Sequence, residues 1–157
     1  MALTEELANQ IINDPNKRIG EPIEWHCTNK EKQKFRFKVS VQAPAYFHLG
    51  QFTFVGQWNP WNWSFVFIGP SGEQIRKIST PHDGHQDPRR GVVAEPDHKH
   101  FWAGELLGDT TTYQPHDICW DTADTVLVDF LQECNITPMY DVPKLSVQLS
   151  LDGAPRI

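Results

Sequence analysis

The sequence has few of the features that mark secreted, membrane-bound or nucleotide-binding proteins. Its three cysteines, Cys27, Cys119 and Cys134, are an odd number, lie far apart and form no C-x-x-C pair. This pattern predicts reduced thiols in a cytoplasmic protein rather than a disulfide framework. No apolar run approaches the roughly 18 residues that a membrane span needs, so we expect no contact with a membrane. The acidic, polar segment 1–18 is unlike a signal peptide.

Several catalytic and cofactor motifs are also missing. The sequence contains no Gly-rich phosphate loop, no Walker motif, no G-x-S-x-G and no H-E-x-x-H. We therefore expect the protein to carry no cofactor. What the chain does have is a globular composition, with 39% hydrophobic residues, six Trp and nine Phe. Its 157 residues are the size of one domain that folds without disulfides or metal.

The charge is unevenly distributed along the chain. The net charge is -6, yet residues 25–100 carry ten Lys/Arg against six Asp/Glu, whereas residues 101–157 carry two against nine. A locally basic middle favours a nucleic acid or nucleotide as partner, and an acidic C-terminal third favours a protein partner. Ordinary solvated surface on both parts is the alternative interpretation.

Hydrophobic periodicity predicts the strands. Residues 34–42, "KFRFKVSVQ", alternate apolar and polar side chains without a fault, which is typical of a half-buried strand with a basic polar face. Residues 46–58 and 61–69 predict a hairpin that turns at Asn59–Pro60. Further strands are expected at 73–79 and 144–152. The aromatic side chains of the hairpin fit core packing better than a base-stacking platform in solvent.

Two segments have helical periodicity. Residues 3–13 predict a short helix with Thr4 as its cap. Residues 121–135 have apolar side chains three and four positions apart. Asp121 is a natural N-cap for this second helix, and Asn135 is a natural end to it. The sequence thus predicts an α+β fold in a single domain: an antiparallel sheet of about four to six strands, with an N-terminal helix and a helix in the C-terminal third packed on it.

The segment 80–102 is the richest in chemistry, because it holds four of the seven histidines. His98 and His100 flank Lys99 in "HKHFW". On a strand the two imidazoles project to the same side and Lys99 to the other. His82 and His85 lie in a Pro/Gly-rich turn that is able to fold over His98 and His100.

This segment predicts metal-independent phosphodiester cleavage. Attack by a ribose 2′-hydroxyl needs a base, an acid for the departing oxygen and a cation beside the phosphate. His98 and His100 are candidates for acid and base near neutral pH, and His82 or His85 would complete the site. The substrate-binding candidates are cationic: Arg89, Arg90 and Lys99 beside the histidines, and Arg36 and Lys38 on the polar face of the strand 34–42.

Two alternatives compete for the same segment. H-x-H together with H-x-x-H supplies four imidazoles, so a metal site is the first, although there is no cysteine pair and a loop of twelve residues separates the halves. The second is a polar surface loop with incidental histidines. For the isolated His26, His48 and His116 we expect no functional role.

The order of these motifs resembles that of a known group. The basic strand, the loop with His82, "DHKHFW" and the helix "LVDFLQECNI" look like small bacterial proteins with H-x-H after the central strands and "DFL…CNI" in the last helix. That layout is similar in turn to TumE-type toxins of type II toxin–antitoxin modules. The resemblance covers about residues 34–136. It matches His82 to the loop histidine, His98 and His100 to the H-x-H, and Phe130 and Leu131 to the packed helix face.

The chain departs from the group's pattern in three places. The group carries an Asp before the loop where this chain reads "IRKIST", the Gly pair after H-x-H is replaced by "FWAG", and segment 144–152 has no counterpart. The resemblance implies a bacterial, toxin-like protein of a mobile or defence-associated locus, with a cognate protein partner.

Two functional hypotheses follow from the sequence. The first is a metal-independent ribonuclease, or toxin-like protein, that acts on RNA or a nucleotide through the histidine cluster. The second is a non-enzymatic interaction module of the antitoxin, inhibitor or adaptor type. It would bind a protein through the acidic C-terminal third or through exposed tryptophans, with the histidine segment as a surface loop.

Overall fold

The computed structural model describes residues 3–31, 33–60, 62–80, 86–87, 92–93, 98–105, 107–108, 111–113 and 122–145. Two α-helices and one 3₁₀ helix occur within them, and the remaining elements are strands. In chain order the elements are α1 (Glu5–Asn13), β1 (Lys17–Ile19), β2 (His26–Cys27), β3 (Phe35–Val41), η1 (Pro44–Leu49), β4 (Phe52–Trp58), β5 (Trp63–Ile68), β6 (Gln74–Thr80), β7 (Gln86–Asp87), β8 (Val92–Val93), β9 (His98–Phe101), β10 (Thr111–Tyr113), α2 (Ala123–Glu133) and β11 (Ile136–Pro138).

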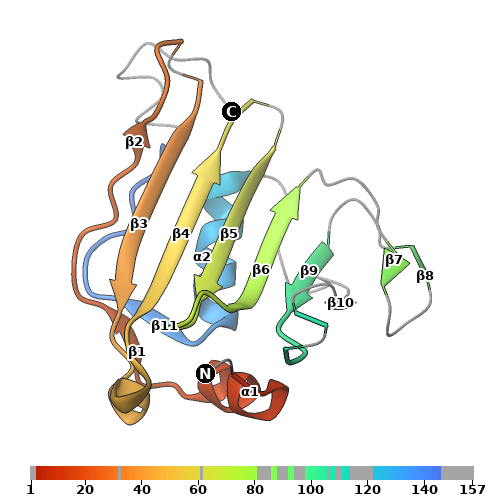
Figure 1. Cartoon of the computed structure of the whole chain (residues 1–157). Coiled ribbons are helices and arrows are strands. Elements are labelled where there is room, and N and C mark those ends of the chain that lie inside the picture. The colour runs from red at the N-terminus through yellow and green to blue at the C-terminus, as the bar shows by residue number, and fades with distance from the viewer. Residues whose placement is uncertain are drawn as a thin grey trace.

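The central sheet is antiparallel and has the strand order β2-β3-β4-β5-β6-β9-β10 (Figure 1). The sheet has seven strands if the two-residue edge strand β2 is counted, and six if it is not. Two smaller pairs complete the described strands: β1 and β11 pair in parallel, and β7 and β8 form a short antiparallel hairpin. The predicted α+β class is confirmed, with an antiparallel sheet, an N-terminal helix and a helix in the C-terminal third.

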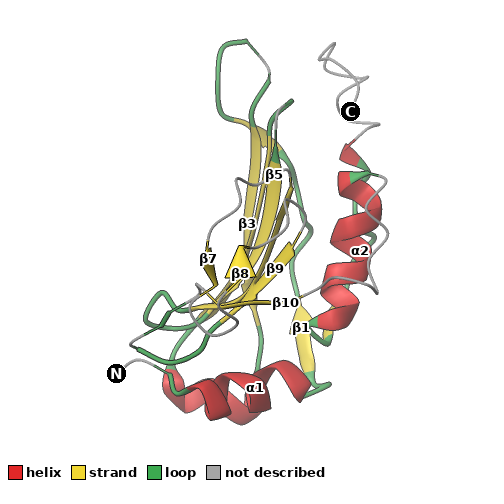
Figure 2. Ribbon diagram, turned by 90° about the vertical axis from the view of Figure 1, so that its right-hand side faces the viewer, coloured by secondary structure: helices red, strands yellow, loops and turns green. Residues whose placement is uncertain are grey.

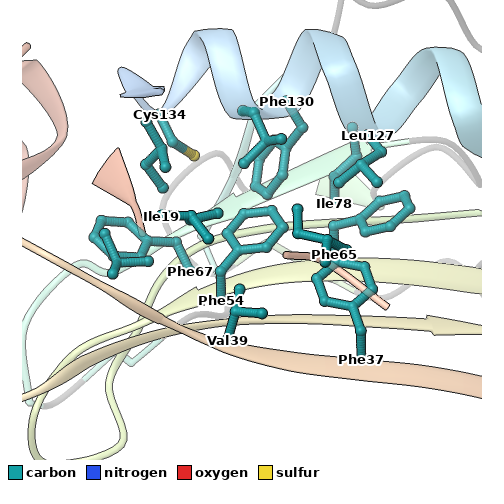
Figure 3. Close-up of a cluster of buried hydrophobic side chains, with 14 of the residues drawn as sticks. Ile19, Phe37, Val39, Phe54, Phe65, Phe67, Ile78, Leu127, Phe130 and Cys134 are labelled. Atoms are coloured by element: carbon teal, nitrogen blue, oxygen red, sulfur yellow. The ribbon is translucent and has the colours of Figure 1, made fainter. Parts of the chain in front are cut away.

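The core lies between the sheet and α2. α2 runs along one face of the sheet, and α1 lies across the end of the sheet (Figure 2). Phe130 of α2 points at Phe54 of β4, with 5.9 Å between ring centroids, and both side chains are fully buried (Figure 3). Helix and sheet are therefore held together by contacts between aromatic and aliphatic side chains.

The aromatic residues of the β4–β5 hairpin belong to this core, as predicted. Trp58 is 4% exposed, and Phe65 and Phe67 are fully buried. The ring of Phe37 lies directly over Gly56, where a Cβ atom would come within 2.1 Å of a ring carbon. Glycine is needed at that position because the phenylalanine ring occupies the space of a side chain.

Most local predictions are confirmed, and two are wrong. Residues 46–49, predicted as the start of a strand, belong to η1, because Pro44 at the start of η1 supplies no N–H for a ladder and suits a first helical turn. The N-cap of α2 is Thr122 and not Asp121, since Thr122 and Thr125 form a reciprocal capping box. Asn135 ends this helix with a φ of 55°. The strand predicted at 144–152 falls almost entirely outside the described residues.

Cys27 and Cys134 are free thiols, and Cys119 lies outside the described residues. Cys27 is exposed, and Cys134, the C-cap residue of α2, is buried. Burial raises the pKa of the Cys134 thiol far above its ordinary value, so this side chain packs as a neutral group. None of the helices within the described part of the chain has the length and apolar character that a membrane crossing requires.

Lys17 fastens α1 to the start of β1. The residue is 1% exposed, and its ammonium group donates to the carbonyl oxygens of Ile11 at 2.6 Å, Ile12 at 3.0 Å and Asp14 at 2.5 Å. These carbonyls belong to the C-terminal turn of α1, which has no basic residue of its own. Burial lowers the pKa of Lys17 to about 8.

We expect Lys17→Met to lower the free energy of unfolding by about 1–3 kcal/mol, because it leaves buried carbonyls without a donor. Arg18→Met, at the exposed neighbouring position, is the control and should change stability by less than about 0.5 kcal/mol. Urea unfolding followed by circular dichroism measures both variants. Equal stability of the two variants would contradict the role of Lys17.

The same residue predicts a pH dependence. The pKa is lower in the folded chain, at about 8, than the ordinary 10.5, so the folded state binds fewer protons between these values. Stability therefore rises with pH through this window. The difference in unfolding free energy between wild type and Lys17→Met should grow by at most about 3 kcal/mol from the bottom of the window to its top. A constant or shrinking difference would show that the pKa is not lowered.

Candidate nucleic-acid interface

The two faces of the sheet differ in their side chains. On β3 the residues Phe35, Phe37, Val39 and Val41 are buried in the core, whereas Arg36 and Lys38 are exposed. Because side chains alternate along a strand, Arg36 and Lys38 stand on the face opposite α2, which we call the outer face. Positions that pair across neighbouring strands project to the same face, so the strand register identifies the outer-face residues of the other strands.

Two rows of paired positions cross the outer face. One runs from Lys38 through Val55 and Val66 to Lys77 and His100. The other runs from Arg36 through Gln57 and Ser64 to Ser79 and the position of His98. Between β3 and β9, each row runs from a cation on β3 to a position of the H-x-H on β9. None of these ten positions is acidic, so the two rows favour an anionic partner.

Accessibility changes along the rows. Arg36, Lys38 and Gln57 are exposed and Lys77 is half-buried, whereas Val66, Ser79 and His100 are buried. A groove of about 500 Å³ lies at the β3 end of the face, between Lys38, Ser40, Thr53 and Ile68. In this structure a large ligand therefore has access to the outer face from its β3 side.

The H-x-H of β9 lies where the alternation predicted. His100 pairs with Lys77, and its side chain is 4% exposed. The backbone of His98 pairs with Ser79, two positions before His100. The two histidine positions share the outer face, and the buried ring of His100 needs a local opening before it can meet a substrate.

Lys99 lies on the other side of the strand. It is 1% exposed and forms an ion pair with Glu133 of α2. This buried ion pair links β9 to the helix. Lys99 is thus separated from His100 by the sheet itself and does not join the cations of the outer face.

His82, His85, Arg89 and Arg90 lie outside the described residues. Their predicted parts in the site stay predictions. Within the described residues, no group of three His, Cys, Asp or Glu side chains is placed to hold a metal ion.

Two residues of the outer face were missed by sequence reasoning. Lys77 stands in register with His100, and the buried hydroxyl of Ser79 has no hydrogen-bond partner within the described residues. Both alternate with the buried Ile78, which is the signal that could have placed them on one face.

Comparison with known proteins gives no relative from which a function could be taken. No protein-family model matches the chain, and neither curated proteins nor solved structures gave a significant match.

Proposed function

We propose that the protein binds RNA across the outer face of its sheet and cleaves it without a metal ion at the β9 end. The observation that carries this proposal is the register: it aligns Arg36, Lys38 and Lys77 with both positions of the H-x-H on one face, with no acidic residue in either row. Cations hold the phosphate backbone, and they act on any sequence.

The spacing of the groups favours a polynucleotide over a mononucleotide. From β3 to β9 there are four strand-to-strand steps, which at about 4.8 Å each amount to roughly 19 Å. A single nucleotide is too short to contact both Arg36 and the β9 histidines. An RNA strand that crosses the sheet spans the distance, and its passage requires that the buried positions Val55, Val66 and Ser79 between the two ends become accessible.

The cleavage step needs only groups that the chain supplies. One imidazole takes the proton from a ribose 2′-hydroxyl, whose oxygen attacks the adjacent phosphorus. The bond from phosphorus to the 5′-oxygen breaks, and a second, protonated imidazole gives its proton to that oxygen. The products are a 2′,3′-cyclic phosphate and a 5′-hydroxyl. Among the described residues, Lys77 is the cation in register with His100 that is placed to stabilise the phosphorane charge.

Binding is tested with the double variant Arg36→Gln/Lys38→Gln. We expect wild type to bind a fluorescent RNA oligomer with an affinity that falls with salt, and the double variant to bind at least about tenfold more weakly with a salt slope smaller by about 1.4. Fluorescence anisotropy over a range of salt concentrations gives both quantities. Both substituted side chains are exposed, so folding should be unchanged.

The control is Lys144→Gln, which removes an exposed cation beyond α2. It should bind RNA as wild type does. Wild type that binds no RNA, or a control that loses as much affinity as the double variant, would refute the outer face as the binding surface.

A second function, as a protein-interaction module, is favoured by the outer side of α2. Val128 is 49% exposed there, in an apolar groove of about 320 Å³ with Val142, Pro143 and the acidic Asp124 and Asp129. The tryptophans give this function no support within the described residues, where Trp25 and Trp58 are buried and Trp63 and Trp102 are half-buried. Trp61 and Trp120 lie outside the described residues. A protein partner that is lost with Val128→Asp but retained with Arg36→Gln/Lys38→Gln would favour it.

A further inference from the structure

A second groove continues the outer face beyond the ends of β3 and β4. It has a volume of about 780 Å³ and is formed by η1, the end of β3 and the start of β4. Ser40 and Gln51 line both this groove and the groove beside Lys38. The two are therefore parts of one continuous surface, and we call the larger one the Phe47 groove.

Phe47 has an unusual exposure for a phenylalanine. Its side chain is 84% exposed, more than that of any other large hydrophobic residue in the described part of the chain, where Met139 and Tyr140 follow at 56% and 55%. Phe47 lies on η1, whose turn is closed by a hydrogen bond of 3.2 Å from the Gly50 N–H to the Phe47 carbonyl. A flat apolar ring is thus displayed at the rim of a groove.

The polar groups of the Phe47 groove are neutral. Gln42 and Gln51 are exposed there, and the Gln51 side-chain amide donates to the Ser40 hydroxyl at 2.6 Å. Amides and hydroxyls of this kind both donate and accept, as the edges of nucleobases do. The groove itself contains no charged lining residue.

Charge lies immediately beside the groove. Lys38 is exposed in the adjoining part of the surface, and Glu21 lines that part as well, its carboxylate accepting from the Ser40 N–H at 3.1 Å. An anion is favoured on the Lys38 side and disfavoured over Glu21. This arrangement of a cation next to an aromatic groove matches a nucleotide unit, with its phosphate on Lys38 and its base on Phe47.

We infer that the Phe47 groove stacks an unpaired base of a single-stranded RNA whose phosphates follow the outer face, an inference that rests on the proposed function. Base stacking on an aromatic ring contributes to affinity without selecting a sequence. A duplex keeps its bases paired and stacked inside, so Phe47 has no base face to contact there. The protein should therefore prefer single strands.

The test compares Phe47→Ala, Phe47→Trp and the control Tyr140→Ala, which removes an exposed aromatic ring after β11. The probes are a labelled oligouridylate of about 12 nucleotides and an RNA duplex of equal length. We expect Phe47→Ala to bind the single strand about tenfold more weakly with an unchanged salt slope, and Phe47→Trp and Tyr140→Ala to bind as wild type does. Wild type should bind the duplex more weakly than the single strand, with no effect of Phe47→Ala on the duplex.

Three results would overturn the inference: wild-type affinity of Phe47→Ala for the single strand, equal binding of duplex and single strand, or an acidic peptide that binds with the same dependence on Phe47. Its failure is distinguishable from failure of the proposed function. If Phe47→Ala has no effect while Arg36→Gln/Lys38→Gln weakens binding, only the base-stacking groove is wrong. If the double variant also binds as wild type does, the outer face does not bind RNA.

Discussion

Replacement of Phe130 by alanine is expected to lower the free energy of unfolding by about 3–5 kcal/mol, because it opens a cavity at the centre of the core. Phe130 is fully buried between α2 and the sheet, and its ring lies against that of Phe54. Chemical unfolding followed by tryptophan fluorescence measures the loss, and Trp25 and Trp58 are buried reporters within the core.

The control for Phe130 lies two residues away on the same helix. Val128 is 49% exposed, so Val128→Ala should change stability by less than about 0.5 kcal/mol. Similar losses in the two variants would mean that α2 is not packed on the sheet through the face that contains Phe130. The same result would remove the basis for assigning the opposite face of the sheet as the outer one.

The second large effect is expected on RNA cleavage. His98→Ala and His100→Gln should each reduce the rate of cleavage of a labelled RNA by at least about 100-fold, because each removes a proton-transfer group. Binding measured by anisotropy should stay within about twofold of wild type, since neither residue is among the exposed cations of β3. Glutamine is chosen at position 100 because the His100 side chain is buried and alanine would leave a cavity.

The matched control is His26→Ala. His26 is an exposed histidine on the edge strand β2, which four strands separate from β9, and its removal should leave cleavage unchanged. Wild-type activity should survive a metal chelator and show a bell-shaped dependence on pH, because one imidazole must be neutral and the other protonated. Cleavage that persists in His98→Ala/His100→Gln, or that a chelator abolishes, would contradict the mechanism.

Expression in a bacterial host offers an independent check of the toxin-like hypothesis. Wild type that arrests growth and degrades cellular RNA, with His98→Ala harmless, would agree with the proposed cleavage. Harmless behaviour of both proteins, with no RNA cleavage by either in the purified state, would leave the interaction module of α2 as the better supported function.

Several elements could be predicted because their signals are local. The alternation over 34–42 places Phe35 and Phe37 in the core and Arg36 and Lys38 in solvent, and both placements are confirmed. The helix of 123–133 follows from its apolar spacing and from Asn135. The errors are local too. Pro44 favours a helical turn over a strand. Thr122 rather than Asp121 caps α2 because Thr122 and Thr125 form reciprocal hydrogen bonds between side chain and backbone.

In the candidate site, too, local patterns could be predicted and pairings between distant residues could not. The sequence identified Arg36 and Lys38 as cations of a polar face and predicted that Lys99 points away from the two histidines of its strand. It had no means of telling that Lys99 meets Glu133, 34 positions later in the chain, or that Lys77 stands beside His100. These pairings depend on strand order and on packing against α2.

By itself the amino-acid sequence determined which side of the strand 35–41 is apolar and where the two α-helices lie, because alternation and helical spacing act over a few residues. Only the tertiary structure decided which polar positions become neighbours. A strand pattern repeats every two residues and fits many registers equally well. The register is set by the burial of Phe54, Phe65 and Ile78 against α2, and that burial aligns the cations of β3 with the histidines of β9.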